Sequence, residues 1–388
     1  MDFDLTDEQE QLRLGVRELA GSFDDDYWLQ KDRDHEFPWE FYDGFAKGGW
    51  LGLAIPEIYG GGGLGILEAS ILLEEVAASG AAMNGCSAIH LTIFGFNVVA
   101  KHASEAVREE VLPRVCTGDL HVCFAVTEPD AGTDTTRIST FATREGNEYV
   151  IRGRKLWITK ATEADKMLIL TRTTPLDQVD RKTDGMTLFL VDMDRDAIEI
   201  RPIDKLGRNA VSSCELFIDD LRVPVESRIG EEGKGFWHIL DGLNPERILL
   251  AHEAVGIGYA ALDRAVNYAE ERVVFDRPIG KNQGIQFPLA EALARLDGAQ
   301  LAARKAAWLY DQGRPCSREA NTAKLLCADA GFFAADRALQ THGGLGYAKE
   351  YHVERYWREA RLMQIAPISQ EMVLNYLAEH VLGLPRSY

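Results

Sequence analysis

The chain has 388 residues, and its 42 lysine and arginine residues against 61 aspartate and glutamate residues give a formal net charge of −19. This acidic balance argues against a nucleic-acid backbone or an anionic membrane surface as the main partner. Hydrophobic residues make up 46% of the chain and charged residues 27%, which is typical of a soluble globular enzyme and excludes a disordered chain. The sequence has no apolar run near the roughly 18 residues of a membrane-spanning helix.

The N-terminal segment Met1–Asp4 is acidic and lacks the basic and apolar regions of a secretory signal, so we expect a cytoplasmic protein. The cysteines are scattered singly, without a C-x-x-C pair or a histidine at zinc-finger spacing: Cys86, Cys116, Cys123, Cys214, Cys316 and Cys327. We therefore expect reduced, buried thiols and no metal site.

The first 120 residues or so have helical spacing. Thr6 to Gln9 match a capping box in front of an apolar stripe. The run Gly60–Gly63 predicts a flexible turn, and helical spacing resumes from Leu67 to Ala78. A phosphate-binding loop is the less favoured alternative for the glycines, because they do not lie between a strand and a helix.

From about residue 120 the pattern changes to the two-residue period of β-strands. We expect strands at Leu120–Thr127, Tyr149–Thr159, Lys166–Thr171, Met186–Val191 and Cys214–Ile218. Because no helical segments separate them, the sequence favours an antiparallel sheet.

After Gly233 the helical pattern returns. Asn244 and Pro245 predict the cap and first residue of a helix, and Gly383 with Pro385 predicts the end of the last one. The length predicts two or three domains. The pattern resolves three in an α+β chain: a helical domain over 1–120, a β domain over 121–232 and a helical bundle over 233–388.

Four strings in this order resemble signatures of the acyl-CoA dehydrogenase family. Phe124–Asp134 is similar to the T-E-P-x-A-G-S-D signature, and the others are Lys155–Thr159, Tyr268–Gln286 and Gln340–Tyr347. The resemblance covers essentially the whole chain. It implies an FAD enzyme in which a base takes the α proton of an acyl-CoA thioester while the β hydrogen leaves as hydride to the flavin.

The resemblance also implies cofactor contacts. Thr127 and Thr159 correspond to hydroxyls on the flavin edge and Trp157 to a ring beside it, although strand residues of these types usually serve β packing. Arg272 corresponds to an arginine on the FAD pyrophosphate; the alternative is a surface arginine paired with Glu270 or Glu271.

Further positions are implied on the same basis. The remaining FAD contacts, several of which cross a subunit interface in the family, are Phe275, Gln283, Gln340, Gly343, Gly344, Ser369 and Glu371. Thr133 is a candidate contact to CoA or to the flavin. Two departures are Asp276, where the family usually has glycine, and Leu206–Ala210, which differs from the commoner L-G-x-R-x-S form.

Two strings compete for the catalytic base. Many family members carry it in a Y-E-G-T string near the C-terminus, but Pro367 stands at that position and proline cannot accept a proton. Leu243–Ile248 resembles the isovaleryl-CoA and long-chain variant, with Glu246 as the base and Asn244 and Arg247 at substrate positions. Local sequence alone favours a structural role, in which Glu246 is an acidic residue that the dipole stabilises in the first turn of a helix. The loss of the other base favours Glu246.

We therefore expect a β-oxidation enzyme that forms a trans-2-enoyl-CoA and passes electrons to an electron-transfer flavoprotein, as a homotetramer or dimer. One alternative is a flavin oxidase or monooxygenase on the same scaffold, because a fold does not fix a function. The other is a non-catalytic acyl-CoA-binding flavoprotein, suggested by the loss of the C-terminal glutamate. Acyl chain length and branching cannot be read from the sequence.

Overall fold

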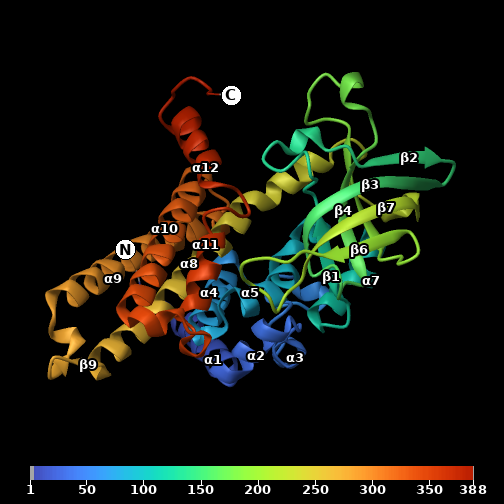
Figure 1. The fold of residues 1–388 in the computed structure, drawn as a ribbon. Coiled ribbons are helices and arrows are strands. Elements are labelled where there is room, and N and C mark those ends of the chain that lie inside the picture. Colours follow the sequence, from blue (N-terminus) through green and yellow to red (C-terminus); the bar gives the residue numbers. More distant parts are fainter. Residues whose placement is uncertain (1–3, 388) are drawn as a thin grey trace.

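The computed structural model describes residues 4–387, so Met1–Phe3 of the N-terminal segment lie outside the described residues. Helices come first, a sheet follows, and helices complete the chain (Figure 1), which confirms the predicted α+β class. Among residues 4–387, no helix has both the length and the apolar character needed to cross a bilayer.

The N-terminal helices are α1 (Asp7–Gly21), α2 (Asp25–Asp34), α3 (Trp39–Lys47), α4 (Ile66–Val76), α5 (Ala82–His90), α6 (Asn97–His102) and α7 (Glu105–Cys116). The predicted capping box is confirmed, because Thr6 Oγ1 accepts from the Gln9 N–H and the Gln9 side chain accepts from the Thr6 N–H. The glycine run precedes α4 as a loop, as predicted.

Within residues 4–387 the main sheet has eight strands: β1 (Val122–Ala125), β2 (Phe141–Glu145), β3 (Glu148–Thr159), β4 (Lys166–Arg172), β5 (Met186–Asp192), β6 (Ile198–Pro202), β7 (Ser213–Pro224) and β8 (Arg228–Ile229). Their order is β6-β7-β3-β2-β4-β5-β8, with β1 paired to β4. The prediction missed β2, β6 and β8, which are short, and β2 and β6 carry exposed charged residues that obscure their period.

Most strand pairs are antiparallel, as predicted, but two pairs within residues 4–387 are parallel, and one of them is the single contact of β2 with β4 between Phe141 and Arg172. β1 runs parallel to β4, with Val122 opposite Lys166. The β2–β3 hairpin lies between them in the chain and returns it to the same end of the sheet, so that it serves as the crossover that a parallel pair requires.

The C-terminal helices are α8 (Gly235–Glu271), α9 (Gln283–Asp311), α10 (Ser317–His342), α11 (Val353–Leu362) and α12 (Gln370–Tyr376). Between α8 and α9, β9 (Val273–Val274) and β10 (Arg277–Pro278) form a hairpin. Figure 1 shows α8 running from the sheet toward this hairpin at the far end of the molecule.

The predicted helix start at Asn244 and Pro245 is wrong. α8 begins at Gly235 and continues through Pro245. The Asn244 side chain donates to Ser317 Oγ and accepts from Arg247 instead of capping a helix. An Asn-Pro pair favours a helix start in isolation, but here packing of α8 on β5 and on helices that include α4, α9 and α10 carries the helix through the proline.

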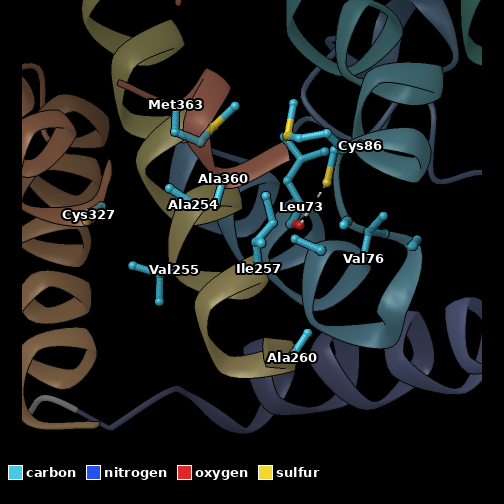
Figure 2. Close-up of a cluster of buried hydrophobic side chains, with 14 of the residues drawn as sticks. Leu73, Val76, Cys86, Ala254, Val255, Ile257, Ala260, Cys327, Ala360 and Met363 are labelled. Carbon is cyan, nitrogen blue, oxygen red and sulfur yellow. Dashed lines mark hydrogen bonds between the residues drawn. The ribbon is translucent and has the colours of Figure 1, made fainter. Parts of the chain in front are cut away.

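The largest core lies where α8 crosses α4 and α10, and Figure 2 shows part of it around Leu73, Ala254 and Ile257. Small residues bring α8 and α10 close together: a Cβ added to Gly331 would lie 2.3 Å from the Ala254 carbonyl oxygen. The six cysteines are buried and free of disulfides, as predicted. The core therefore fixes α8 along much of its length.

We predict that Gly331→Ala destabilises the protein by about 1–3 kcal/mol, because the new methyl would meet backbone that cannot rotate away. The matched control is Gly298→Ala on α9, where an added Cβ would have no neighbour within 4 Å among residues 4–387. That change should stabilise by about 0.5–1 kcal/mol. Urea unfolding of both holoproteins at one protein concentration measures the difference. Equal midpoints for Gly331→Ala and the wild type would contradict the close crossing.

Candidate active site

Two of the signature strings lie side by side at one end of β3. The Leu156 N–H donates to the Thr127 carbonyl oxygen at 2.9 Å. The pairing of β3 with β7 is irregular between Lys155 and Ile158, and Trp157 has a φ of +62° with 52% of its surface exposed. The irregularity turns the indole out of the sheet, while Thr127 and Thr159 remain half-buried beside it. This arrangement offers a flat apolar face next to two hydroxyl groups.

A buried ion pair holds these strings in place. Lys155 Nζ lies 2.9 Å from Glu128 Oε1 and also donates to the carbonyl oxygens of Val126 and Leu170. Glu128 accepts from the Ser139 N–H and hydroxyl and from the Thr140 N–H. The glutamate of the first signature is therefore a structural anchor for Thr127.

The protonation of this pair follows from its surroundings. Burial lowers the pKa of Lys155 to about 8, although Glu128 opposes the shift. Burial acts to raise the pKa of Glu128, but Lys155 and the hydrogen bonds from residues 139 and 140 outweigh it, so that this pKa lies below its ordinary value. At neutral pH both groups are charged, and each depends on the other for compensation.

The last turn of α5 connects the sheet with α8. On one side Arg208 donates to Ser87 Oγ and to Thr159 Oγ1, both at 3.3 Å. On the other side His90 Nε2 lies 2.9 Å from Glu246 Oε2. Since Ser87 and His90 are three residues apart on a helix, Thr159 and Glu246 converge on one helical turn. The structure thus brings the predicted base and a predicted flavin contact together.

His90 is a site residue that the sequence did not reveal. Its Nδ1 lies 2.7 Å from Glu253 Oε1, so one imidazole joins two glutamates of α8. Burial acts to lower the pKa of His90, but Glu246 and Glu253 outweigh it and raise that pKa well above its usual value. The glutamates lie 156 and 163 residues away in the chain, so no local motif signals the contact.

The other substrate positions lie beside Glu246 on α8 or on the loop after β1. Arg247 donates to Asn244 Oδ1 at 3.2 Å, and its buried Nε has no partner within residues 4–387. Burial lowers the pKa of Arg247, which remains a cation. Thr133 is exposed. A buried guanidinium with a spare donor suits a carbonyl or an anionic ligand.

A second group of predicted cofactor residues lies far from the first. Arg272 follows α8 directly and Phe275 lies in the turn between β9 and β10, whereas Gln283 begins α9. Continuous helix separates Arg272 from Glu246, 26 residues away, which corresponds to about 39 Å. Within one chain, these residues and Trp157 cannot contact the same flavin ring.

The Arg272 side chain is exposed and makes no ion pair with any residue from 4 to 387, so the alternative pairing with Glu270 or Glu271 is absent there. Phe275 and Asp276 have φ values of +53° and +64°. Two such residues in a two-residue hairpin loop form a turn that favours glycine, which accounts for the glycine usual at the second position.

Gln340 and the glycines after it form the exposed end of α10. Gly343 has a φ of +60°, and neither Gly343 nor Gly344 would bring an added Cβ within 4 Å of another atom of residues 4–387. Ser369 caps α12 by accepting from the Met372 N–H, and Glu371 is exposed in the first turn. These segments offer open backbone and polar groups at the surface.

The C-terminal base position is closed. Pro367 precedes Ile368, whose carbonyl oxygen accepts a 2.7 Å hydrogen bond from the buried Lys324. The neighbouring carboxylate, Glu371, points from the first turn of α12 and is exposed. Residue 367 therefore offers no carboxylate that could act as the base in place of Glu246.

The donor set fits FAD in two separate parts. Trp157, Thr127 and Thr159 offer a ring face and hydroxyls for an isoalloxazine edge. The unpaired Arg272 guanidinium and the open glycines of residues 343–344 suit phosphate groups and the parts next to them. Glu246, near the first part, and Arg272, in the second, lie about 39 Å apart along α8.

Comparisons with known proteins agree along the whole chain. Residues 6–119, 123–221 and 233–382 match the families described as the N-terminal, middle and C-terminal domains of acyl-CoA dehydrogenase. Acyl-CoA dehydrogenase fadE12 of Mycobacterium bovis is 39% identical over 387 residues, which cover 99% of this chain and 98% of that protein.

Solved structures are similar as well. Glutaryl-coenzyme A dehydrogenase in complex with glutaryl-CoA superposes with a TM-score of 0.91 at 30% identity, covering 100% of this chain and 98% of the other. Butyryl-CoA dehydrogenase of Megasphaera elsdenii gives a TM-score of 0.89 at 30% identity and covers 98% of this chain and 100% of its own.

We predict that Lys155→Met destabilises the protein by about 3–5 kcal/mol and lowers its FAD content, because Glu128 would keep a buried charge without a partner. The matched control is Lys166→Met, which breaks an ion pair to Asp192, whose side chain is 81% exposed. The control should cost at most about 1 kcal/mol. Thermal unfolding and the ratio of flavin to protein absorbance measure both effects. Similar values for the two variants would contradict the anchoring role.

Proposed function

The chain belongs to the acyl-CoA dehydrogenase family and is an FAD-dependent enzyme of that class, and from this premise we propose that Glu246 is its catalytic base. The reaction proposed is the α,β-dehydrogenation of an acyl-CoA thioester to the trans-2-enoyl-CoA. The observation that carries the proposal is the convergence of Glu246 and Thr159 on the last turn of α5. Thr159 is linked to this turn through Arg208 and Glu246 through His90, which suits a substrate that binds next to the turn and reaches both the base and the flavin.

The position of Glu246 in its helix supports a functional role. A glutamate in the first turn of a helix is stabilised by the helix dipole and needs no catalytic role. Glu246 lies 11 residues after the start of α8, so the dipole does not explain its presence. Its side chain is 27% exposed although it is paired with a buried histidine. A carboxylate in mid-helix that is held and still accessible is suited to accept a proton.

Each residue of the proposed site has a separate role in the reaction. Glu246 takes the α proton, and Arg247, supported by Asn244, donates to a polar group of the substrate. When bound, FAD supplies the acceptor for the β hydrogen, which leaves as hydride. Trp157 packs beside the flavin ring, and the hydroxyls of Thr127 and Thr159 orient its polar edge. Thr133 adds a contact to CoA or to the flavin.

The second group of cofactor residues completes the site from another subunit. Arg272 binds the pyrophosphate, with further contacts from Phe275, Gln283, Gln340, Gly343, Gly344, Ser369 and Glu371. The distance of about 39 Å along α8 supports this division between two copies. The enzyme is thus an obligate homo-oligomer, a dimer or a tetramer.

Family membership supports the wider role. The reduced enzyme passes its electrons to an electron-transfer flavoprotein, and the reaction serves fatty-acid β-oxidation in the cytoplasm. An oxidase on the same scaffold would instead release hydrogen peroxide in step with turnover. The identity of the acyl group is found by testing butyryl-, octanoyl-, palmitoyl-, isovaleryl- and glutaryl-CoA for reduction of the flavin.

We predict that Glu246→Gln keeps FAD but slows anaerobic flavin reduction by about 10²–10⁴-fold, because a positioned base is lost while the shape is kept. The matched control is Asp241→Asn, an exposed carboxylate on the same helix that pairs with His102. It should be reduced at the wild-type rate. Loss of flavin absorbance after mixing with the acyl-CoA panel measures both. Near-wild-type reduction of Glu246→Gln would exclude it as the base.

We predict that two inactive variants restore activity when they assemble together. Glu246→Gln homo-oligomers lack the base and Arg272→Ala homo-oligomers lose affinity for FAD. In a mixed pair, one of the two sites has both Glu246 and Arg272 intact. Co-expression with two different affinity tags isolates this species, and about half of the wild-type activity per flavin-binding pair is expected. No activity in the mixed species would contradict a site shared between subunits.

A further inference from the structure

Glu246, the proposed base, is linked to two buried side chains that the proposed reaction does not use, His90 and Glu253. Each imidazole nitrogen lies within hydrogen-bond distance of a carboxylate oxygen, at 2.9 Å for Glu246 and 2.7 Å for Glu253. Glu253 is completely buried and its second oxygen has no partner within residues 4–387. Burying an ionised glutamate with a single hydrogen-bond partner lowers the stability of the fold, which indicates that this arrangement serves another purpose.

We propose that His90 is a positioning residue for the base: anchored by Glu253, it holds Glu246 in one orientation and balances its charge. This inference rests on the proposed function. His90 touches neither the reacting carbon nor the cofactor contacts, and it acts through Glu246 alone.

With both glutamates ionised, His90 carries both ring protons. A neutral imidazole has one donor, whereas two ionised carboxylates need one each. The imidazolium then donates Nε2–H to Glu246 and Nδ1–H to Glu253, and the three groups together carry one negative charge. His90 is thereby locked in a single ring orientation by the fully buried Glu253.

The free oxygen of Glu246 is the one that reacts. Oε2 is occupied by His90, whereas Oε1 has no hydrogen-bond partner among residues 4–387 and is not buried. When the Cα–H bond breaks, its proton forms an O–H bond at Oε1. The electron pair goes into the new Cα=Cβ bond as the β hydrogen leaves as hydride to the flavin. The two protons of His90 stay in place, and the three groups become neutral overall.

Charged and titratable groups from several elements lie around His90 and Glu253. Glu246 and Glu253 from α8 are the charges that act on His90 itself. Glu253 also faces Arg208, next to β7, and Cys86 on α5. Further charged groups on the neighbouring elements are Lys160 after β3 and Glu359 on α11.

The test compares two buried histidines of the same kind. His90→Gln keeps a donor for Glu246 but removes the positive charge. His252→Gln is the matched control, because His252 also pairs with a buried glutamate, Glu74, at 2.5 Å, but does not contact Glu246. Both variants are purified as holoproteins, and FAD content and thermal unfolding report whether they fold. Flavin reduction is then followed across pH with the acyl-CoA that reduces the wild type fastest.

We predict that His90→Gln slows the limiting rate of flavin reduction by on the order of 10–10²-fold, with little change in the acyl-CoA concentration at half-saturation. The acidic limb of its pH profile moves to higher pH, because loss of the imidazolium makes the ionised carboxylate of Glu246 less favourable. The pH profile of His252→Gln stays that of the wild type. Glu253→Gln removes the anchor of the His90 ring, so it also slows flavin reduction, and combining it with His90→Gln adds little further loss of rate.

The outcomes separate the two hypotheses. If the wild type is reduced but His90→Gln keeps its rate and its pH profile, the role of His90 is wrong and the proposed function stands. If His90→Gln does not fold, Glu253→Gln decides, and an unchanged rate of flavin reduction overturns the inference. If no acyl-CoA reduces the wild type, the proposed function fails and the role of His90 fails with it.

Discussion

Helix α8 runs unbroken for 37 residues, and the position of every other part of the site is set relative to it. One end meets the sheet at Gly235, where an added Cβ would lie 2.7 Å from the Leu188 nitrogen. Its middle carries Glu246 and Glu253 against α5, and its far end leads to Arg272. A rigid rod of this length separates the two halves of the cofactor site within one chain. For this reason the proposed site includes residues of a second subunit.

Local signals predicted the parts of the fold that depend on neighbours in sequence. The capping box at Thr6 and the cores of five strands were confirmed, because hydrogen bonds and side-chain periods of this kind are set within a few residues. The helix start at Pro245 was wrong because packing against distant elements overrides a local breaker. The parallel pairing of β1 with β4 was missed because strand direction depends on the path of the hairpin between them.

The residues of the candidate site divide in the same way, into those that local strings indicate and those that only the folded chain brings together. Trp157 and Glu246 were named from short strings; the structure places Trp157 at the exposed irregularity of β3 and Glu246 beside His90 of α5, and their roles remain predictions. His90 and Glu253 have no motif, since a histidine on α5 meets a glutamate of α8 only after the core has formed. The net charge of −19 gives no indication of small anionic ligands either, because the proposed binding of such ligands depends on single cations such as Arg247 and Arg272.

In the proposed reaction, Glu246 and the flavin lie on opposite sides of the reacting carbons. A crystal structure of the holoenzyme with a 3-thia-acyl-CoA, a substrate analogue that cannot be dehydrogenated, would show this arrangement. We expect Glu246 Oε1 to face the α carbon within about 3–3.5 Å, with His90 on Oε2 and Trp157 beside the flavin ring. An α carbon that lies against residues 365–369, with Glu246 turned away from it, would exclude Glu246 as the base.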